Sequence, residues 1–145
     1  MNKEVIPIFF SSDDNYIPFL SVAINSLISN ANKEYNYEII ILNSGLSSEN
    51  IQKISKYSKE NVNIKFEDVR PKIKDIIKDL ELRLRDYYSI SIFYRLFIPS
   101  LFKEYKKAIY LDADIVLVDD ISKLYNEDIN DFLVAGVPDE VVNNN

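Results

Sequence analysis

The sequence predicts an α/β fold in which a mainly parallel sheet is covered by helices on both faces. Short, unbroken apolar runs of strand length alternate with segments whose apolar residues recur at helical spacing. Strands that are apolar on both sides are typical of parallel sheets buried between two layers of helices. The alternation of strand and helix favours the same class. We therefore expect a three-layered, Rossmann-like architecture.

The first expected strand is the apolar run VIPIFF, Val5 to Phe10, which stops at a cluster of cap- and turn-forming residues, Ser11 to Asn15. A helix should follow, because Pro18 suits a first helical turn and the apolar residues around it keep a helical spacing. The apolar face of this helix is expected to consist of Ile17, Leu20, Ile24, Leu27 and Ile28.

The next elements follow the same pattern. Ile39 to Leu42 is a second apolar run, and Ser47 can cap a helix that carries Ile51, Ile54 and Tyr57. Val62 to Val69 alternates apolar and polar residues, so we expect a third strand nearer an edge of the sheet.

Two further helices and two further strands are expected in the rest of the chain. After Pro71 the apolar spacing marks an amphipathic helix through Ile73, Ile76, Ile77, Leu80 and Leu84. Another helix should begin at Ser91, be lined by Ile92, Phe93, Leu96 and Phe97, and end at Pro99. The expected strands are Ile109 to Leu111 and Phe132 to Val137.

Composition limits the possible functions. The 145 residues, 47% of them apolar, suffice for one domain with a single core. Acidic residues outnumber basic ones by 23 to 17 and the basic ones are scattered, so no nucleic acid is expected as a partner. Without cysteine or histidine, chemistry must rest on carboxylates, Arg, Lys, Tyr or a metal held by oxygen. No transmembrane segment or signal peptide is expected, which favours a cytoplasmic protein.

Two aspartates interrupt the apolar stretch AIYLDADIVLVDD, residues 108–120. Asp112 should lie at or just past the carboxyl end of a strand, where open α/β sheets bind their ligands. Because residues i and i+2 of an extended segment point the same way, Asp112 and Asp114 should aim at one point, with Ala113 turned aside. Two close carboxylates need a compensating cation, and Mn²⁺ or Mg²⁺ would supply it while also holding substrate phosphates.

The same residues also fit a solvated turn. In that interpretation the aspartates cap backbone groups, and Asp119 and Asp120 continue an acidic loop. Asp-x-Asp is a short motif that occurs often by chance. Its place between two strongly apolar runs nevertheless favours a site, since a surface turn does not require such a setting.

The chain resembles the N-terminal half of glycosyltransferase family 8, the group that includes bacterial lipopolysaccharide galactosyl- and glucosyltransferases and glycogenin. The segments that carry the resemblance are PIFFSSDDNYIPFLSVAINSLI, EIIILNSGLSSENIQKI, and FYRLFIPSLF followed by KAIYLDADIVLVDDISKLYNEDI. The resemblance implies a GT-A fold, a UDP-hexose donor and transfer with retention at the anomeric carbon. It also implies a glycan or protein acceptor, as in lipopolysaccharide or other cell-surface glycan biosynthesis.

The resemblance also implies roles for single residues. Asp112 and Asp114 stand where the family holds Mn²⁺ (or Mg²⁺), which bridges the diphosphate of the UDP-sugar and neutralises the leaving UDP. Arg95 stands where the family has an arginine near the diphosphate and donor sugar, which makes it the candidate catalytic residue. Taken without the family, Arg95 would be assigned to a surface ion pair.

A nucleotide loop is implied after the first strand. Asp13, Asn15 and Tyr16 match it, because a carboxylate can accept from the uracil N–H, an amide can pair with base or ribose, and a phenol ring can stack on the base. Ser12 and Ala113 complete the candidate substrate-binding residues. Read alone, the same cluster after the first strand is a helix N-cap, and both roles can hold for different members.

One departure from the family concerns the metal. Family members continue into a second half that supplies the acceptor site and a histidine as third protein ligand, whereas this chain has no histidine. We therefore expect residues 1–145 to form a single donor-binding domain, the N-terminal part of a longer enzyme that works at the inner face of the membrane. For this domain, nucleotide binding is a safer prediction than turnover.

Three other classes fit part of the pattern. A haloacid-dehalogenase-type phosphatase would use Asp112 as nucleophile and Asp114 as general acid, but its motif normally opens the domain. A receiver-like signalling domain would use Asp13, Asp14 and Asp68 and would leave the Asp-x-Asp pair without a role. A UDP-sugar-binding half-domain without turnover is the third class.

Overall fold

The computed structural model describes residues 3–73 and 90–137. In these ranges the strands β1 (Val5–Ser11), β2 (Asn36–Asn43), β3 (Val62–Asp68) and β4 (Ile109–Leu111) form one four-stranded sheet in the order β3-β2-β1-β4. All three neighbouring pairs are parallel. The predicted parallel α/β architecture is therefore confirmed, and β3 lies at an edge as its alternating sequence indicated.

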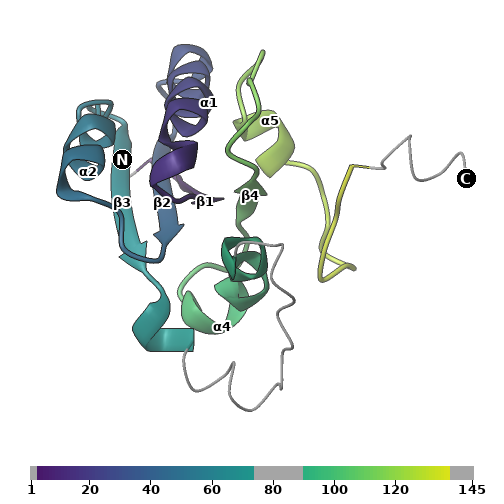
Figure 1. Ribbon diagram of the computed structural model, residues 1–145. Helices are drawn as coiled ribbons and strands as arrows, with labels where there is room; N and C mark the ends of the chain where they lie inside the picture. Colours follow the sequence, from purple (N-terminus) through teal and green to yellow (C-terminus); the bar gives the residue numbers. More distant parts are fainter. Residues whose placement is uncertain (1–2, 74–89, 138–145) are drawn as a thin grey trace, which may run out of the picture.

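The strand register brings two loops to the same edge of the sheet. Phe10 of β1 pairs with Ile41 of β2 on one side and with Leu111 of β4 on the other. Since β4 ends at Leu111 and β1 ends one residue after Phe10, the loops that follow these strands leave the sheet next to each other (Figure 1).

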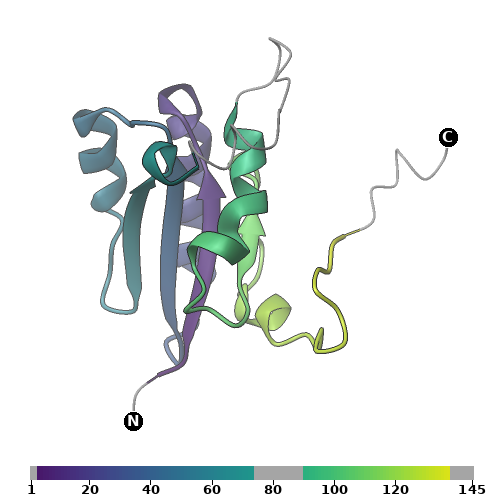
Figure 2. The same cartoon turned by 90° about the horizontal axis from the view of Figure 1, so that it is seen from below.

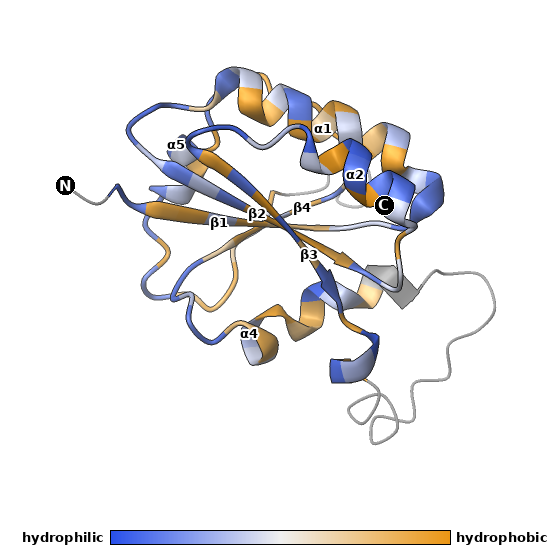
Figure 3. Cartoon of the chain, turned by 90° about the vertical axis from the view of Figure 1, so that its left-hand side faces the viewer, coloured by the Kyte–Doolittle hydropathy of each residue, from blue (hydrophilic) through white to orange (hydrophobic). Residues whose placement is uncertain are grey.

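Helices cover both faces of the sheet (Figure 3). One face carries α1 (Ile17–Asn30), α2 (Ser48–Ser55) and the short α5 (Ser122–Tyr125). The other face carries the 3₁₀ helix η2 (Ile90–Phe97) and the α-helix that continues it, α4 (Ile98–Leu101). A single 3₁₀ turn, η1 (Asp14–Tyr16), joins β1 to α1.

The core consists of two apolar clusters, one on each side of the sheet, because successive strand residues point to opposite faces. Ile8, Phe10 and Ile39 pack under α1, whereas Phe9 and Ile40 pack under η2. All five residues predicted for the apolar face of α1 are buried. The Ser47 cap is confirmed as well, since its side chain accepts from the backbone N–H of Asn50.

Pro99 does not end a helix as predicted. It lies in the first turn of α4, and the helix runs on to Leu101. The reason is that a first-turn residue has no carbonyl to donate to within the helix, so the missing N–H of proline costs nothing there. The helix expected after Pro71 is present over residues 70–73, and its remainder lies outside the described residues.

The strand expected at Phe132 to Val137 is also wrong. This segment runs away from the sheet without regular structure (Figures 1 and 2), and Leu133 is fully exposed. A strand needs a partner for its backbone N–H and C=O groups, and none of the strands in the described ranges pairs with this segment. In the same ranges no helix has both the length and the apolar character to cross a bilayer.

We expect Ile41→Ala to lower the free energy of unfolding by about 2–5 kcal/mol, because Ile41 is fully buried in the middle of β2 and its loss leaves a cavity. Urea unfolding followed by circular dichroism measures this. Val22→Ala removes an apolar side chain that is 54% exposed on the outer side of α1, and its effect should stay within about 0.5 kcal/mol. Similar losses for the two variants would contradict the assigned core.

Candidate functional site

The loop after β1 begins with residues that bind one another. Ser12 is buried, with its backbone N–H on the carbonyl of Leu42 and its hydroxyl on the carbonyl of Asp13. Asp13 caps η1, because its Oδ1 accepts from the N–H groups of Asn15 at 2.9 Å and Tyr16 at 3.1 Å. The N-cap interpretation of this cluster is thus confirmed, and the cap holds the loop in one shape at the carboxyl edge of the sheet.

Tyr16 presents an aromatic surface next to this cap. Its side chain is 49% exposed, and its ring packs against that of Phe19 with 5.6 Å between centroids. Asn15 is exposed beside it. The loop therefore exposes an aromatic ring and a side-chain amide at the edge of the sheet.

Asp14 fixes the same loop to α2. Its carboxylate accepts from the backbone N–H and hydroxyl of Ser47 and, at 2.7 Å, from the side-chain amide of Asn50. The hydrogen bond from Asn50, followed by that from the Ser47 N–H, lowers the pKa of Asp14 below its ordinary value of 3.8. The N-cap of α2 was predicted, but this partner 33 residues earlier in the chain was missed.

Asp112 and Asp114 flank a buried alanine just past the end of β4. Both aspartates are exposed, while Ala113 is only 6% exposed and packs into the core under α1. Ala113 is thus turned aside as predicted. The expected extended segment is wrong, however, because residues 113–114 form a turn. The burial of Ala113 in the cluster on the α1 side explains this, since the turn places its side chain in the core and leaves the two aspartates exposed.

Arg95 of η2 contacts Asp112 directly. Its Nη2 donates to Asp112 Oδ1 at 2.9 Å, and its guanidinium carbon lies 4.4 Å from the ring centroid of Tyr110 on β4. The two charged side chains are 39% and 56% exposed. Burial raises the pKa of the Tyr110 hydroxyl, and the charge of Arg95 partly opposes this rise. Arg95 therefore forms a surface ion pair, and the partner in that pair is the candidate metal ligand Asp112.

The donor set of this edge suits a particular kind of metal binding. Within residues 3–73 and 90–137, no three His, Cys, Asp or Glu side chains gather closely enough to hold a metal ion by themselves. Asp112 and Asp114 supply carboxylate oxygens, the ligands that Mg²⁺ and Mn²⁺ prefer. Such ions are commonly held by one or two carboxylates together with substrate phosphates. The residues present therefore fit a metal that binds together with a diphosphate.

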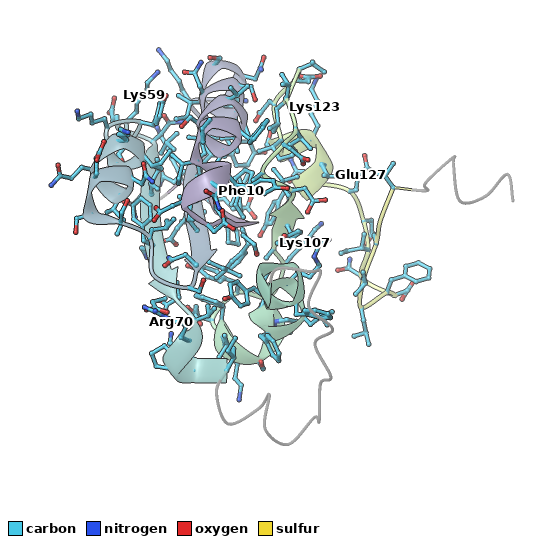
Figure 4. The ribbon with its side chains drawn as sticks, in the orientation of Figure 1. Phe10, Lys59, Arg70, Lys107, Lys123 and Glu127 are labelled. Carbon is cyan, nitrogen blue, oxygen red and sulfur yellow. The ribbon has the colours of Figure 1, made fainter. Side chains whose placement is uncertain are left out.

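A second charged group lies at the carboxyl ends of β2 and β3. Arg70 (Figure 4) forms a bidentate ion pair with Asp68, in which Nε lies 2.9 Å from Oδ1 and Nη2 lies 2.5 Å from Oδ2. Its guanidinium lies over Gly45, whose φ of +102° favours glycine and whose added Cβ would come within 2.6 Å of Arg70. The hydrogen bonds from Arg70 lower the pKa of Asp68. Asp68 is therefore engaged in an ion pair.

The acidic residues after the Asp-x-Asp pair have structural partners. Asp119 pairs with Lys123, four residues later on α5. Asp120 accepts from the hydroxyl of Tyr37 at 2.7 Å and from both the N–H and the hydroxyl of Ser122. Asp119 and Asp120 thus continue an acidic loop, as the turn interpretation expected, and their contacts fix the start of α5.

A family model and several known proteins match the chain. The model of glycosyl transferase family 8 matches residues 7–145. General stress protein A of Bacillus subtilis (strain 168) is 30% identical over 140 residues, which cover 94% of this chain and 47% of that protein. Glycosyltransferase GlyB of Streptococcus pneumoniae serotype 4 is 32% identical over 135 residues, which cover 91% of this chain and 31% of GlyB.

A solved structure shows the same fold. The apo structure of the WbbM bifunctional glycosyltransferase superposes with a TM-score of 0.81 at 32% identity, over 97% of this chain and 24% of that one. The expected GT-A type of α/β fold is therefore confirmed. The chain spans less than half of the length of each of these relatives.

The hydrogen bonds to Asp14 should make stability depend on pH. A carboxyl with a lowered pKa in the folded chain adds stability above its unfolded pKa and loses it as the pH falls through the folded value. We expect the difference in the free energy of unfolding between the unsubstituted chain and Asp14→Asn to be constant from pH 7 to about pH 5 and to shrink below about pH 4. Urea unfolding across this range measures it. A difference that stays constant down to pH 2 would contradict the assigned hydrogen bonds.

Proposed function

Since the chain belongs to glycosyl transferase family 8, we propose that it is the donor-binding part of a metal-dependent hexosyltransferase that uses a UDP-hexose. In this proposal residues 1–145 form one nucleotide-sugar-binding domain. The sugar passes to a glycan or protein acceptor with retention at the anomeric carbon, as the family resemblance implies. A phosphatase with Asp112 as nucleophile and a receiver-like domain are not supported by the family match.

The observation that carries the proposal is the meeting of three segments at one edge of the sheet. The register of β1 and β4 places the loop with Asp13 beside the loop with Asp112. η2 adds Arg95, which reaches the carboxylate of Asp112 at 2.9 Å. This edge, at the carboxyl ends of the strands, is where open α/β sheets bind nucleotides. A ring, an amide, two carboxylates and a guanidinium are therefore available to one extended ligand.

Each residue has a proposed task in binding the donor. Tyr16 stacks on the uracil ring, and Asn15 pairs with base or ribose atoms. Asp13, while its Oδ1 caps η1, accepts from the uracil N–H. Ser12 and Ala113 contribute mainly through shape, because their burial sets the path of the backbone beside the ligand.

The diphosphate is proposed to lie over the Asp112 loop. Asp112 and Asp114 would hold Mn²⁺ or Mg²⁺, which when bound supplies Lewis-acid stabilisation of the charge on the departing UDP. Arg95 donates to phosphate or donor-sugar oxygens, for which its planar fork of N–H groups is suited. It is therefore proposed as the catalytic residue of this half of the site, since it touches the group that leaves.

We expect UDP to bind the chain in the presence of Mn²⁺ and not after its removal with a chelator, because without the ion the two aspartates repel the diphosphate. Isothermal titration calorimetry measures the affinity, and Asp112→Asn should abolish binding. Asp119→Asn removes an exposed carboxylate seven residues further on, outside the proposed site, and should leave the affinity unchanged. Equal UDP affinity with and without metal would count against the proposal.

A further inference from the structure

The carboxylate proposed to hold the metal is already paired with a cation. Arg95 Nη2 lies 2.9 Å from Asp112 Oδ1, so the guanidinium already compensates the negative charge to which a metal ion would bind. Two positive groups at one carboxylate repel each other. We propose that Arg95 is the internal counter-ion of Asp112 and that a divalent ion must displace it. This inference rests on the proposed function, because it takes Asp112 as a metal ligand.

Tyr110 keeps the displaced guanidinium close to the site. The guanidinium carbon of Arg95 lies 4.4 Å from the centroid of the Tyr110 ring, within the range of a cation–π contact. Tyr110 belongs to β4 and precedes Asp112 by two residues, so its ring has a fixed place next to the loop that carries Asp112 and Asp114. Arg95 can therefore leave the carboxylate without leaving the edge of the sheet.

The diphosphate gives Arg95 a second anion to bind. Its guanidinium fits phosphate oxygens in a bidentate manner, as it fits a carboxylate. When the metal arrives together with UDP, the metal replaces Arg95 as the cation bound to Asp112. The phosphate in turn replaces Asp112 as the anion bound to Arg95. The metal arriving alone would cost the ion pair between Arg95 and Asp112, whereas a phosphate contact of Arg95 replaces that pair when UDP arrives with the metal. Metal and nucleotide therefore favour each other's binding through Arg95, and this coupling acts equally in both directions.

Arg95→Gln should change the two affinities in opposite directions. Without nucleotide, Mn²⁺ should bind about twofold to fivefold more tightly, the range expected when an exposed ion pair no longer competes. At saturating Mn²⁺, UDP should bind more weakly, because the phosphate contact is lost. The first affinity is measured from the electron paramagnetic resonance signal of free Mn²⁺, the second by calorimetry. A merely structural role of Arg95 would weaken both.

Two further variants separate the ion pair from the overall charge. Arg95→Lys keeps the positive charge and should bind Mn²⁺ like the unsubstituted chain while binding UDP more weakly, because the planar fork is lost. Lys107→Gln removes a cation whose Nζ donates to the backbone carbonyl of Glu127, so this change releases no carboxylate (Figure 4). It should leave the Mn²⁺ affinity unchanged.

The outcomes distinguish this inference from the proposed function. If the unsubstituted chain binds no UDP with Mn²⁺, both are wrong. If it does, but Arg95→Gln leaves Mn²⁺ affinity unchanged or lowers it, only the counter-ion role is overturned. An increase of the same size in Lys107→Gln would overturn it too, since long-range charge would then account for the effect.

Discussion

The parallel pairing of β1 with β4 is the interaction on which the rest of the site depends. Three residue pairs, from Ile8–Ile109 to Phe10–Leu111, fix the level at which both strands end. Because the strands run in the same direction, their following loops start side by side, although about 100 residues separate them in sequence. A shift of this register by one residue would also turn every β4 side chain to the opposite face.

The chain after Asp114 is held by α1. The hydroxyl of Ser26 accepts from the N–H of Leu117 at 2.9 Å, and the amide of Asn30 donates to the Leu117 carbonyl at 3.0 Å. Leu117 itself is buried under the helix, while Val116 and Val118 on either side are exposed. The apolar run after the aspartates is thus an irregular segment attached to a helix. This segment and the buried Ala113 hold the Asp-x-Asp loop against the core on its α1 side. Both carboxylates remain exposed to solvent.

Local periodicity was sufficient to predict the sheet and the helices α1 and α2, because apolar spacing and cap residues act within a few positions. The alternation of apolar and polar residues in β3 likewise indicated an edge strand. The end of the apolar run at Leu111 indicated where the loop with Asp112 begins. Contacts between segments that are distant in the chain could not be predicted from the sequence. Neither the pairing of Arg95 with Asp112 nor that of Asp14 with Asn50 leaves a pattern along the chain, since each depends on how separate elements are packed. The error at Phe132 has the same origin, because an apolar run shows strand propensity but not whether a neighbouring strand exists.

The two outer strands of the sheet have a consequence for how separate molecules meet. β3 is a charged strand, in which exposed Lys65 pairs with Glu38 of β2 and half-buried Glu67 pairs with Lys72. β4 has only three residues and gives a very short row of backbone groups at the other side. Charged or very short border strands discourage a second sheet from adding on. For the sheet formed by the described residues, association through intermolecular β-pairing is therefore disfavoured at both borders.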